Sequence, residues 1–210
     1  MIACWSCGAT RPANAALCPA CNKVQPPPAL ARLEEPATGG ARTRAASIDK
    51  FAFLGFDPDF DIDTPKLEHR FRELSRKLHP DRFARATPQE RRFSLEQTTL
   101  LNDAYKTLRD PVRRAEHLLS LRGVAGEPKM SPEFLEETID DREKLLEAKM
   151  SGAPLDELVK AAEGKRDDAL ARVRSLMVEG GDLQEAAELL ARMKYYARYL
   201  DEAAGKPAEV

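Results

Sequence analysis

All four cysteines of the 210-residue chain lie within its first 21 residues. They form the pattern C-x2-C-x10-C-x2-C, made by Cys4, Cys7, Cys18 and Cys21. Each pair can present two thiolates from one tight turn, and Gly8 and Pro19 suit such turns. Four sulfur atoms at about 2.3 Å satisfy a tetrahedral Zn²⁺ ion. A closed four-thiolate site has no open coordination position, so the spacing predicts a structural metal site, not a catalytic one.

Two disulfides, inert thiols or a redox pair are the competing interpretations of these cysteines. No export signal precedes Cys4, and disulfides are rare in the reducing compartment that this implies. A redox CxxC motif fits less well, because two matched pairs occur and no βαβ pattern surrounds them. We therefore expect zinc as a structural cofactor, with iron as the other candidate.

A second candidate for a functional site is the stretch KLHPDRF, Lys77 to Phe83. As a general base, His79 would need a nucleophile or a carboxylate pair at a suitable spacing, and the sequence offers neither. As a metal ligand it is isolated, and capping the loop with Asp81 is the purely structural alternative. Pro80 must end or kink a helix near His79, because proline lacks the N–H of a helix interior. These three residues therefore indicate a bend after the helix and not a catalytic site.

Helices are predicted on both sides of this bend. The first begins at Thr64-Pro65, with proline where its missing N–H costs nothing. Its apolar stripe consists of Leu67, Phe71, Leu74 and Leu78. The second begins with the capping box Thr87-Pro88-Gln89-Glu90 and runs through Leu108. A shorter helix, capped by Ser47 and ended by Gly55, precedes both. The bend would then lie at the tip of an antiparallel helical hairpin.

On the outer faces of the first hairpin helix, basic residues outnumber the acidic residues Glu68 and Glu73. The cations are Lys66, Arg70, Arg72, Arg76 and Lys77. A charged helix face is usually only a solvated face. Cations gathered on one helix can also dock on an acidic partner, where charge complementarity speeds encounter and sets orientation.

The helix ending in FLGF, the basic helix, the His-Pro-Asp tripeptide and the segment LLNDAYKTLRDP together resemble a J-domain. J-domains are the modules by which DnaJ-type co-chaperones stimulate ATP hydrolysis in DnaK-type chaperones. The resemblance implies a chain that is no enzyme itself and that binds the chaperone ATPase. The chaperone-binding residues would be His79, Pro80, Asp81, Lys66, Arg70, Arg72, Arg76 and Lys77.

The segments TLRDPVRRAEHLLSLRG and REKLLEA extend the resemblance, over about residues 48 to 205, to the HscB family of iron–sulfur cluster biogenesis. In that family a C-terminal three-helix bundle holds an IscU-type scaffold and delivers it to an HscA-type chaperone. The resemblance assigns scaffold binding to Leu135, Ile139, Asp140, Glu143, Glu147 and Tyr195. Glu136 replaces the family's usual methionine, and Asp141 replaces an often apolar residue. Helical spacing alone also allows a core position for Leu135 and Ile139, and a merely solvated ridge for the carboxylates.

Helix signals support a bundle independently of the resemblance. Ser131-Pro132 opens one helix, Pro154 opens a second that ends at Gly180-Gly181, and Asp182 with Glu185 makes a capping-box-like start for a third. We expect an all-α fold: a J-domain hairpin, an antiparallel three-helix bundle and a small N-terminal zinc knuckle or ribbon. The expected boundaries are 1–25 for the knuckle, 26–47 for a flexible linker, 48–125 for the J-domain and 126–210 for the bundle. The Pro- and Gly-rich linker predicts a knuckle that is tethered and not packed on the rest.

Composition narrows the partners and the compartment. The net charge of -2 argues against a generally basic nucleic-acid binder, although a zinc-dependent nucleic-acid module and a general J-protein with another client remain rival interpretations. No stretch reaches the roughly 20 apolar residues of a membrane helix.

The motifs CWSCG and CPAC resemble the N-terminal domain of family members from animal mitochondria. Cys4 leaves no room for a presequence, so we expect a bacterial cytoplasm, or the mitochondrial matrix if a presequence was removed, and a monomer or weak dimer.

Overall fold

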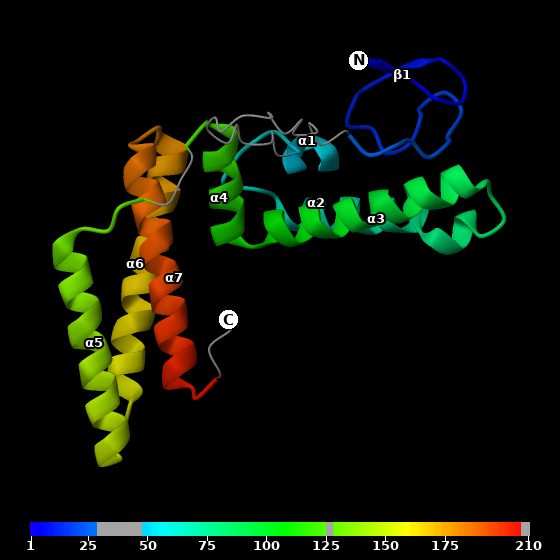
Figure 1. Cartoon of the computed structure of the whole chain (residues 1–210). Helices are drawn as coiled ribbons and strands as arrows, with labels where there is room; N and C mark the ends of the chain where they lie inside the picture. Colours follow the sequence, from blue (N-terminus) through cyan, green and yellow to red (C-terminus); the bar gives the residue numbers. More distant parts are fainter. Residues whose placement is uncertain (29–47, 125–127, 207–210) are drawn as a thin grey trace, which may run out of the picture. The chain divides into compact units, whose positions relative to one another are not determined.

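The structure is a computed structural model that describes residues 1–28, 48–124 and 128–206 (Figure 1). The chain divides into two compact units, Met1–Arg114 and Ala115–Val210. In the described residues, seven α-helices and one two-stranded sheet make up the regular structure, apart from a short 3₁₀ turn. The expected all-α class with an N-terminal cysteine knuckle is confirmed.

The first unit begins with a small cysteine module, which we define as residues 1–28. Its strands β1 (Ile2–Ala3) and β2 (Thr10–Arg11) pair antiparallel, and an isolated bridge joins Leu17 to Val24. Arg11 is buried and donates from Nη1 to the carbonyl oxygens of Pro12 and Ala15, at 3.1 and 3.0 Å. The module is therefore organised by polar contacts and by its cysteines, and it has very little apolar core.

Three helices and a 3₁₀ turn form the rest of this unit: α1 (Lys50–Leu54), α2 (Thr64–Leu78), η1 (Pro80–Phe83) and α3 (Pro88–Arg109). The predicted capping box is confirmed, with Thr87 and Glu90 each satisfying the other's backbone N–H. Gly55 ends α1 with a φ of 81°, as expected. The helix starts differ slightly, because Asp49 caps α1 and Asp63 caps α2; Ser47 lies outside the described residues.

The hairpin is held by the apolar stripe of α2 packed on α3. Leu67, Leu74 and Leu78 are buried, and the half-buried Phe71 stacks on Tyr105 of α3 with 4.1 Å between ring centroids. Phe71 therefore joins α2 to α3, while Arg70 donates from Nε to the carbonyl oxygen of Leu54 in α1 at 3.3 Å.

The cysteine module packs on α3, which differs from the expectation of a free, tethered knuckle. Trp5 meets Phe93 edge to face, with 5.9 Å between ring centroids, and Gln97 donates from Nε2 to the carbonyl oxygen of Gln25 at 3.0 Å. Cysteine spacing identifies metal ligands but does not reveal which neighbours, such as Trp5, bury against another element. Residues 29–47, which hold most of the predicted linker, lie outside the described residues, and the domain boundaries stay predictions.

The helix α4 (Pro111–Leu121) leads into the second unit, where α5 (Pro132–Ser151), α6 (Asp156–Glu179) and α7 (Leu183–Ala203) lie side by side (Figure 1). Leu145 of α5, Ala162 of α6 and Tyr199 of α7 are buried together. Ser131 caps α5 and Asp182 caps α7, as predicted. The predicted capping-box role of Glu185 is wrong, because its carboxylate pairs with Arg172 of α6 at 2.7 Å.

Lys165 of α6 forms ion pairs with two carboxylates of α5, one of which is Asp141, the acidic residue at a position that is often apolar in the family. Its ammonium lies 2.6 Å from Glu137 and 2.9 Å from Asp141. Burial lowers the pKa of Lys165, but hydrogen bonds to the two carboxylates outweigh burial and raise it above its ordinary value. The acidic residue at an often apolar position therefore has a cationic partner on the neighbouring helix.

We predict that Asp141 and Lys165 are energetically coupled. Asp141→Leu and Lys165→Leu should each destabilise the protein by about 1 kcal/mol, a modest value because the side chains are 22% and 35% exposed. The double variant should lose less than the sum, because Asp141 and Lys165 are then removed together and only Glu137, which is 42% exposed, is left without its partner. Urea denaturation of the four proteins measures the coupling, with Lys160→Leu, an exposed lysine of α6, as control. Additive effects would show that the contact contributes nothing.

Candidate functional site

Pro80 ends α2 and creates the bend at the tip of the hairpin. Proline has no N–H, so the carbonyl oxygen of Arg76 loses its usual helical donor. The Arg82 guanidinium donates to that oxygen from Nη1 at 3.4 Å. A side chain from beyond the bend thus satisfies the carbonyl that the bend exposes.

Two hydroxyl groups of α3 hold the end of α2 in place. Ser94 Oγ and Thr98 Oγ1 both donate to the carbonyl oxygen of Leu78, at 2.6 and 3.1 Å. Leu78 is the last residue of α2, directly before His79. The position of the following segment, residues 79–86, which we call the His-Pro-Asp loop, is therefore fixed by contacts with α3.

His79 and Asp81 are both open to solvent, with 54% and 91% of their side chains exposed. The backbone N–H of Asp81 donates to His79 Nδ1 at 3.3 Å. An accepting Nδ1 carries no proton, so the neutral imidazole has its hydrogen on Nε2, free to donate to a partner. The local contact matches the loop-capping alternative as well, and the two roles are compatible.

Glu73 pairs with two of the five predicted cations of α2. Its carboxylate lies 2.6 Å from Lys77 Nζ and 2.8 Å from Arg70 Nη1. Hydrogen bonds from Lys77 and then Arg70 lower the pKa of Glu73 to about 2. Both cations are thus held in defined positions. The carboxylate between them lowers the net positive charge of this part of α2.

The other three predicted cations differ in their surroundings. Arg72 pairs with Glu68 at 2.5 Å, and the ammonium of Lys66 lies 5.6 Å from the ring centroid of Phe56. Arg76 makes no ion pair with any described residue. The face is less strongly positive than the count of cations suggests, and Arg76 is its most available charge.

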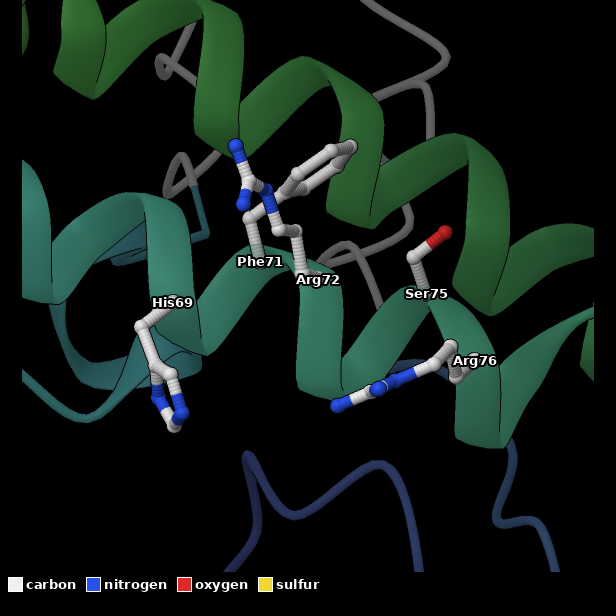
Figure 2. Close-up of a pocket in the computed structure, with 5 residues that line it drawn as sticks. All are labelled: His69, Phe71, Arg72, Ser75 and Arg76. Carbon is white, nitrogen blue, oxygen red and sulfur yellow. The ribbon is translucent and has the colours of Figure 1, made fainter.

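A depression on α2 brings some of these groups together. It is lined by His69, Phe71, Arg72, Ser75 and Arg76, and Figure 2 shows Phe71 directed toward α3. Phe71 was predicted only as part of the apolar stripe, yet it is half-buried and offers part of its ring beside two arginines. The combination of helical spacing with flanking arginines was visible in the sequence and could have identified it.

The four cysteines converge as predicted. Their sulfur atoms all lie within 4.8 Å of one another, and the Cys4–Cys21 and Cys7–Cys18 pairs are 3.8 Å apart. Sulfurs bound at 2.3 Å to the centre of a regular tetrahedron are about 3.8 Å apart. The donor set and its spacing therefore fit a tetrahedral thiolate metal site.

The two cysteine pairs adopt the same turn. Gly8 N donates to Cys4 O at 3.0 Å, and Asn22 N donates to Cys18 O at 2.9 Å. Both donors have a positive φ, 73° for Gly8 and 57° for Asn22, a conformation that glycine and asparagine tolerate best. Burial opposes ionisation of Cys4, but N–H donors at Cys7 and Ser6 lower its pKa to about 6. That shift favours the thiolate of Cys4 that a metal requires. At Cys7 a backbone N–H at Ala9 acts in the same direction, but contacts with the neighbouring thiols, Cys21 first, raise its pKa to about 12.

In the second unit, α5 exposes an apolar surface. Leu135 and Ile139 are 49% and 58% exposed, so the alternative that they are core residues is wrong. Asp140, Glu143 and Glu147 are exposed beside them, and we call these three the acidic ridge. The predicted scaffold-facing residues of α5 are therefore accessible.

Tyr195 differs from this group because it is only half-exposed. Its hydroxyl donates to the carbonyl oxygen of Thr138 at 2.8 Å, and its ring meets Phe134 edge to face. Burial raises the pKa of Tyr195 to about 12. Tyr195 therefore attaches α7 to α5 and can support the surface from behind.

Two residues that the sequence analysis missed extend this surface. Leu146 and Met150 are 59% and 81% exposed. At about 100° per residue, Leu135, Ile139, Leu146 and Met150 lie within about 60° of one another around α5. We call these four residues the α5 apolar stripe. Their spacing in the sequence was the available signal.

Comparison with known proteins identifies the family. A DnaJ domain model matches residues 49–117, and a model described as the HSCB C-terminal oligomerisation domain matches residues 130–204. The mouse iron-sulfur cluster co-chaperone protein HscB is 33% identical over 92% of this chain and 78% of its own length. This chain belongs to the HscB family of co-chaperones.

Further HscB proteins agree with this assignment. A co-chaperone protein HscB homolog of Shewanella pealeana is 36% identical over 74% of this chain and 94% of its own length. The crystal structure of human HscB superposes with a TM-score of 0.76 at 31% identity, covering 96% of both chains. HscB from Vibrio cholerae has a TM-score of 0.67 over 74% of this chain and 95% of its own length. The J-domain and the C-terminal helical domain are thus those of an HscB co-chaperone of iron–sulfur cluster assembly.

None of the described helices of this HscB-family chain combines the length and the apolar character needed to cross a bilayer.

We predict a pH-dependent contribution of Glu73 to stability. Its pKa falls from 4.5 to about 2 on folding, so the ionised carboxylate stabilises the folded protein above pH 4.5 and loses this effect as the pH falls toward 2. Glu73→Gln should cost about 0.5 kcal/mol at pH 7, since the pairs are exposed, and less at each step below pH 4.5. Urea denaturation between pH 7 and pH 3 checks this, with Glu163→Gln, an exposed glutamate of α6, as control. A difference that grows toward acid would contradict it.

Proposed function

We propose that this HscB-family protein binds an IscU-type iron–sulfur scaffold and delivers it to an HscA- or DnaK-type chaperone, whose ATPase activity it stimulates through the His-Pro-Asp loop. The observation that carries the proposal is the exposure of His79 and Asp81 at the tip of the hairpin. A catalytic pair would need a substrate pocket, whereas these side chains face solvent on a loop fixed at its base. Such an arrangement suits recognition of another protein.

The tip would act by directional contacts. His79 offers Nε2–H as a donor, and Asp81 offers a carboxylate that is 91% exposed. Pro80 restricts the loop, so little ordering is needed on binding. The chaperone contacts would favour the hydrolysis-competent state of the partner, and this protein would hydrolyse nothing itself.

The cations of α2 would orient the same encounter. Glu73 holds Arg70 and Lys77 in place, and Arg76 presents an unpaired charge within the described part of the chain. Fixed cations facing an acidic surface raise the association rate and select one orientation. Phe71 adds an apolar contact in the depression beside Arg76.

The scaffold would dock along α5. Leu135 and Ile139 supply exposed apolar area, and the acidic ridge lies beside them. Exposed apolar groups rimmed by charges mark binding surfaces more often than isolated ones do. Leu146 and Met150 continue the surface toward the C-terminal end of α5, so we include them in the docking area.

Zinc is the metal that we propose for the cysteine site, in a structural role. The closely spaced thiolates support this, because four sulfurs leave no coordination position for a substrate. Cys4, Cys7, Cys18 and Cys21 would hold the ion. A bacterial cytoplasm and a monomeric or weakly dimeric state stay predictions.

We predict that His79→Gln abolishes stimulation of a DnaK-type ATPase while leaving scaffold binding unchanged. The variant replaces the rigid imidazole ring by a flexible amide, whose donor lies at a different position, and the side chain is exposed, so helix content by circular dichroism should not change. Steady-state ATP turnover with increasing co-chaperone measures the effect. Because His117 is buried and His69 lines the depression on α2, neither is a matched control; scaffold affinity of the same variant serves instead. Undiminished stimulation would remove the proposed mechanism.

We predict that Leu135→Ala/Ile139→Ala weakens the complex with an IscU-type scaffold by about tenfold or more, because hot-spot truncations cost about 1–2 kcal/mol each. Leu146→Ala/Met150→Ala should weaken it less, by a few-fold. Isothermal titration calorimetry measures both affinities, and Val178→Ala, a 49% exposed valine of α6, is the control.

The melting temperature separates binding from folding in these variants. Both double variants should melt within a few degrees of the unmodified chain, since exposed residues contribute little to stability. A large loss of stability would show that the residues act in the core. Unchanged affinity in both double variants would place the docking surface elsewhere. No binding of the scaffold by the unmodified chain, with ATPase stimulation retained, would indicate a J-protein that serves another client.

A further inference from the structure

The cysteine module touches one face of α3 at three positions with helical spacing. These are Glu90, Phe93 and Gln97. Lys23 lies with its Nζ atom 2.6 Å from Glu90 Oε1. The remaining contacts are the edge-to-face meeting of Trp5 with Phe93 and the bond from Gln97 to the Gln25 carbonyl. The module therefore contacts the part of α3 that directly follows the His-Pro-Asp loop.

One carboxylate connects the module to the start of α3. While Glu90 Oε1 pairs with Lys23, Glu90 Oε2 accepts from the backbone N–H of Thr87 at 3.2 Å and from its hydroxyl at 2.9 Å. The carboxyl group is 5% exposed. A hydrogen bond from Lys23, opposed by burial, lowers the pKa of Glu90. Glu90 thus completes the capping box as a carboxylate whose counter-ion, Lys23, comes from the cysteine module.

The same face of α3 determines both ends of the His-Pro-Asp loop. Its first end follows Leu78, whose carbonyl oxygen accepts from Ser94 and Thr98. Its other end is followed directly by Thr87, the N-cap of α3, whose backbone N–H donates to Glu90. Unwinding of the first turn of α3 would release the second attachment and leave the loop fixed at one end only.

The position of Lys23 depends on the second cysteine turn. Lys23 is two residues beyond Cys21, and its carbonyl oxygen accepts from Cys18 N at 3.0 Å and from Gln25 Nε2 at 2.7 Å. Its backbone is therefore part of the second cysteine turn. A metal that joins the four thiolates would fix this turn, and with it the position of the ammonium group.

We propose that Lys23 is a positioning residue for the His-Pro-Asp loop: the metal-loaded cysteine site holds it on Glu90, which completes the α3 cap and keeps the loop in one arrangement. The functional part of this inference rests on the proposed chaperone-binding role of the loop. The structural part does not, because the order of the loop can be measured without any chaperone.

A purely structural cysteine module gives a different expectation. Such a module would stabilise the first unit as a whole, and its loss would loosen α2 as much as the loop. Loss of Lys23 alone leaves a buried carboxylate without its counter-ion, and the nearest way to relieve this is to expose the first turn of α3 to water. The effect of Lys23 should therefore concentrate in residues 79–90.

Hydrogen exchange on the full-length, zinc-loaded protein tests the proposal. Loss of a helix cap of typical strength predicts about fivefold faster exchange for amides within 79–90 in Lys23→Met. The amides of Leu67 to Leu74 in α2, and those of the second unit, should be unchanged. Lys23→Arg should restore protection, because a guanidinium can also pair with Glu90. Lys106→Met, which removes a lysine of α3 that makes no ion pair with the described residues, is the control.

Metal removal provides the second arm. One equivalent of zinc should be present in the unmodified chain and in every lysine variant. Chelation should accelerate exchange of the loop in the unmodified protein and add little in Lys23→Met, because both changes act through the same contact. Equal acceleration throughout the first unit in Lys23→Met, or an unchanged loop despite loss of the lysine, would overturn the proposal.

The ATPase assay separates this inference from the proposed function. With a DnaK-type chaperone, Lys23→Met should raise the concentration that gives half-maximal stimulation by less than about twofold, because fivefold more frequent opening lowers the ordered fraction of a mostly closed loop only slightly, and the maximum should be retained. His79→Gln should abolish the maximum itself. If the unmodified protein does not stimulate the chaperone, the proposed function fails, whereas the exchange results still decide the role of Lys23.

Discussion

The backbone break that Pro80 imposes at the end of α2 is the constraint on which the candidate site depends. A helix that ends leaves carbonyl groups without donors, and these must find partners elsewhere. Here Arg82 donates to the Arg76 carbonyl, and Ser94 and Thr98 donate to that of Leu78. The partners come from the loop itself and from α3. Satisfying the broken end therefore fixes the loop, and His79 and Asp81 remain exposed on a rigid support.

Several charged side chains of this protein form ion pairs that connect elements of the fold. Glu73 holds two cations of α2, Lys165 joins α5 to α6, and Glu90 links the cysteine module to the cap of α3. Each ion connects two or more groups, which restricts side chains that would otherwise be mobile. A partner that meets such a surface finds charges already in place, so less entropy is lost on binding.

Local sequence signals predicted much of the fold, and the limits have a physical origin. The capping box at Thr87, the left-handed Gly55 and the cysteine turns depend on residues within a few positions of one another, and all are confirmed. The contact of Lys23 with Glu90 joins residues 67 positions apart, so no periodicity or cap could indicate it. The ion pair of Asp141 with Lys165 also joins two different helices, so the sequence pattern alone did not explain the acidic residue at position 141.

The division into two units agrees with a protein that brings two partners together. The candidate chaperone site lies in Met1–Arg114, and the candidate scaffold site lies on α5 in Ala115–Val210. Linking two binding sites on one chain turns the second encounter into an intramolecular one, with an effective concentration set by the connection. The proposed delivery of a scaffold would therefore need no contact between the two sites. It needs each site to be rigid in its own unit, which the α3 contacts provide for the loop and the Lys165 ion pairs provide for α5.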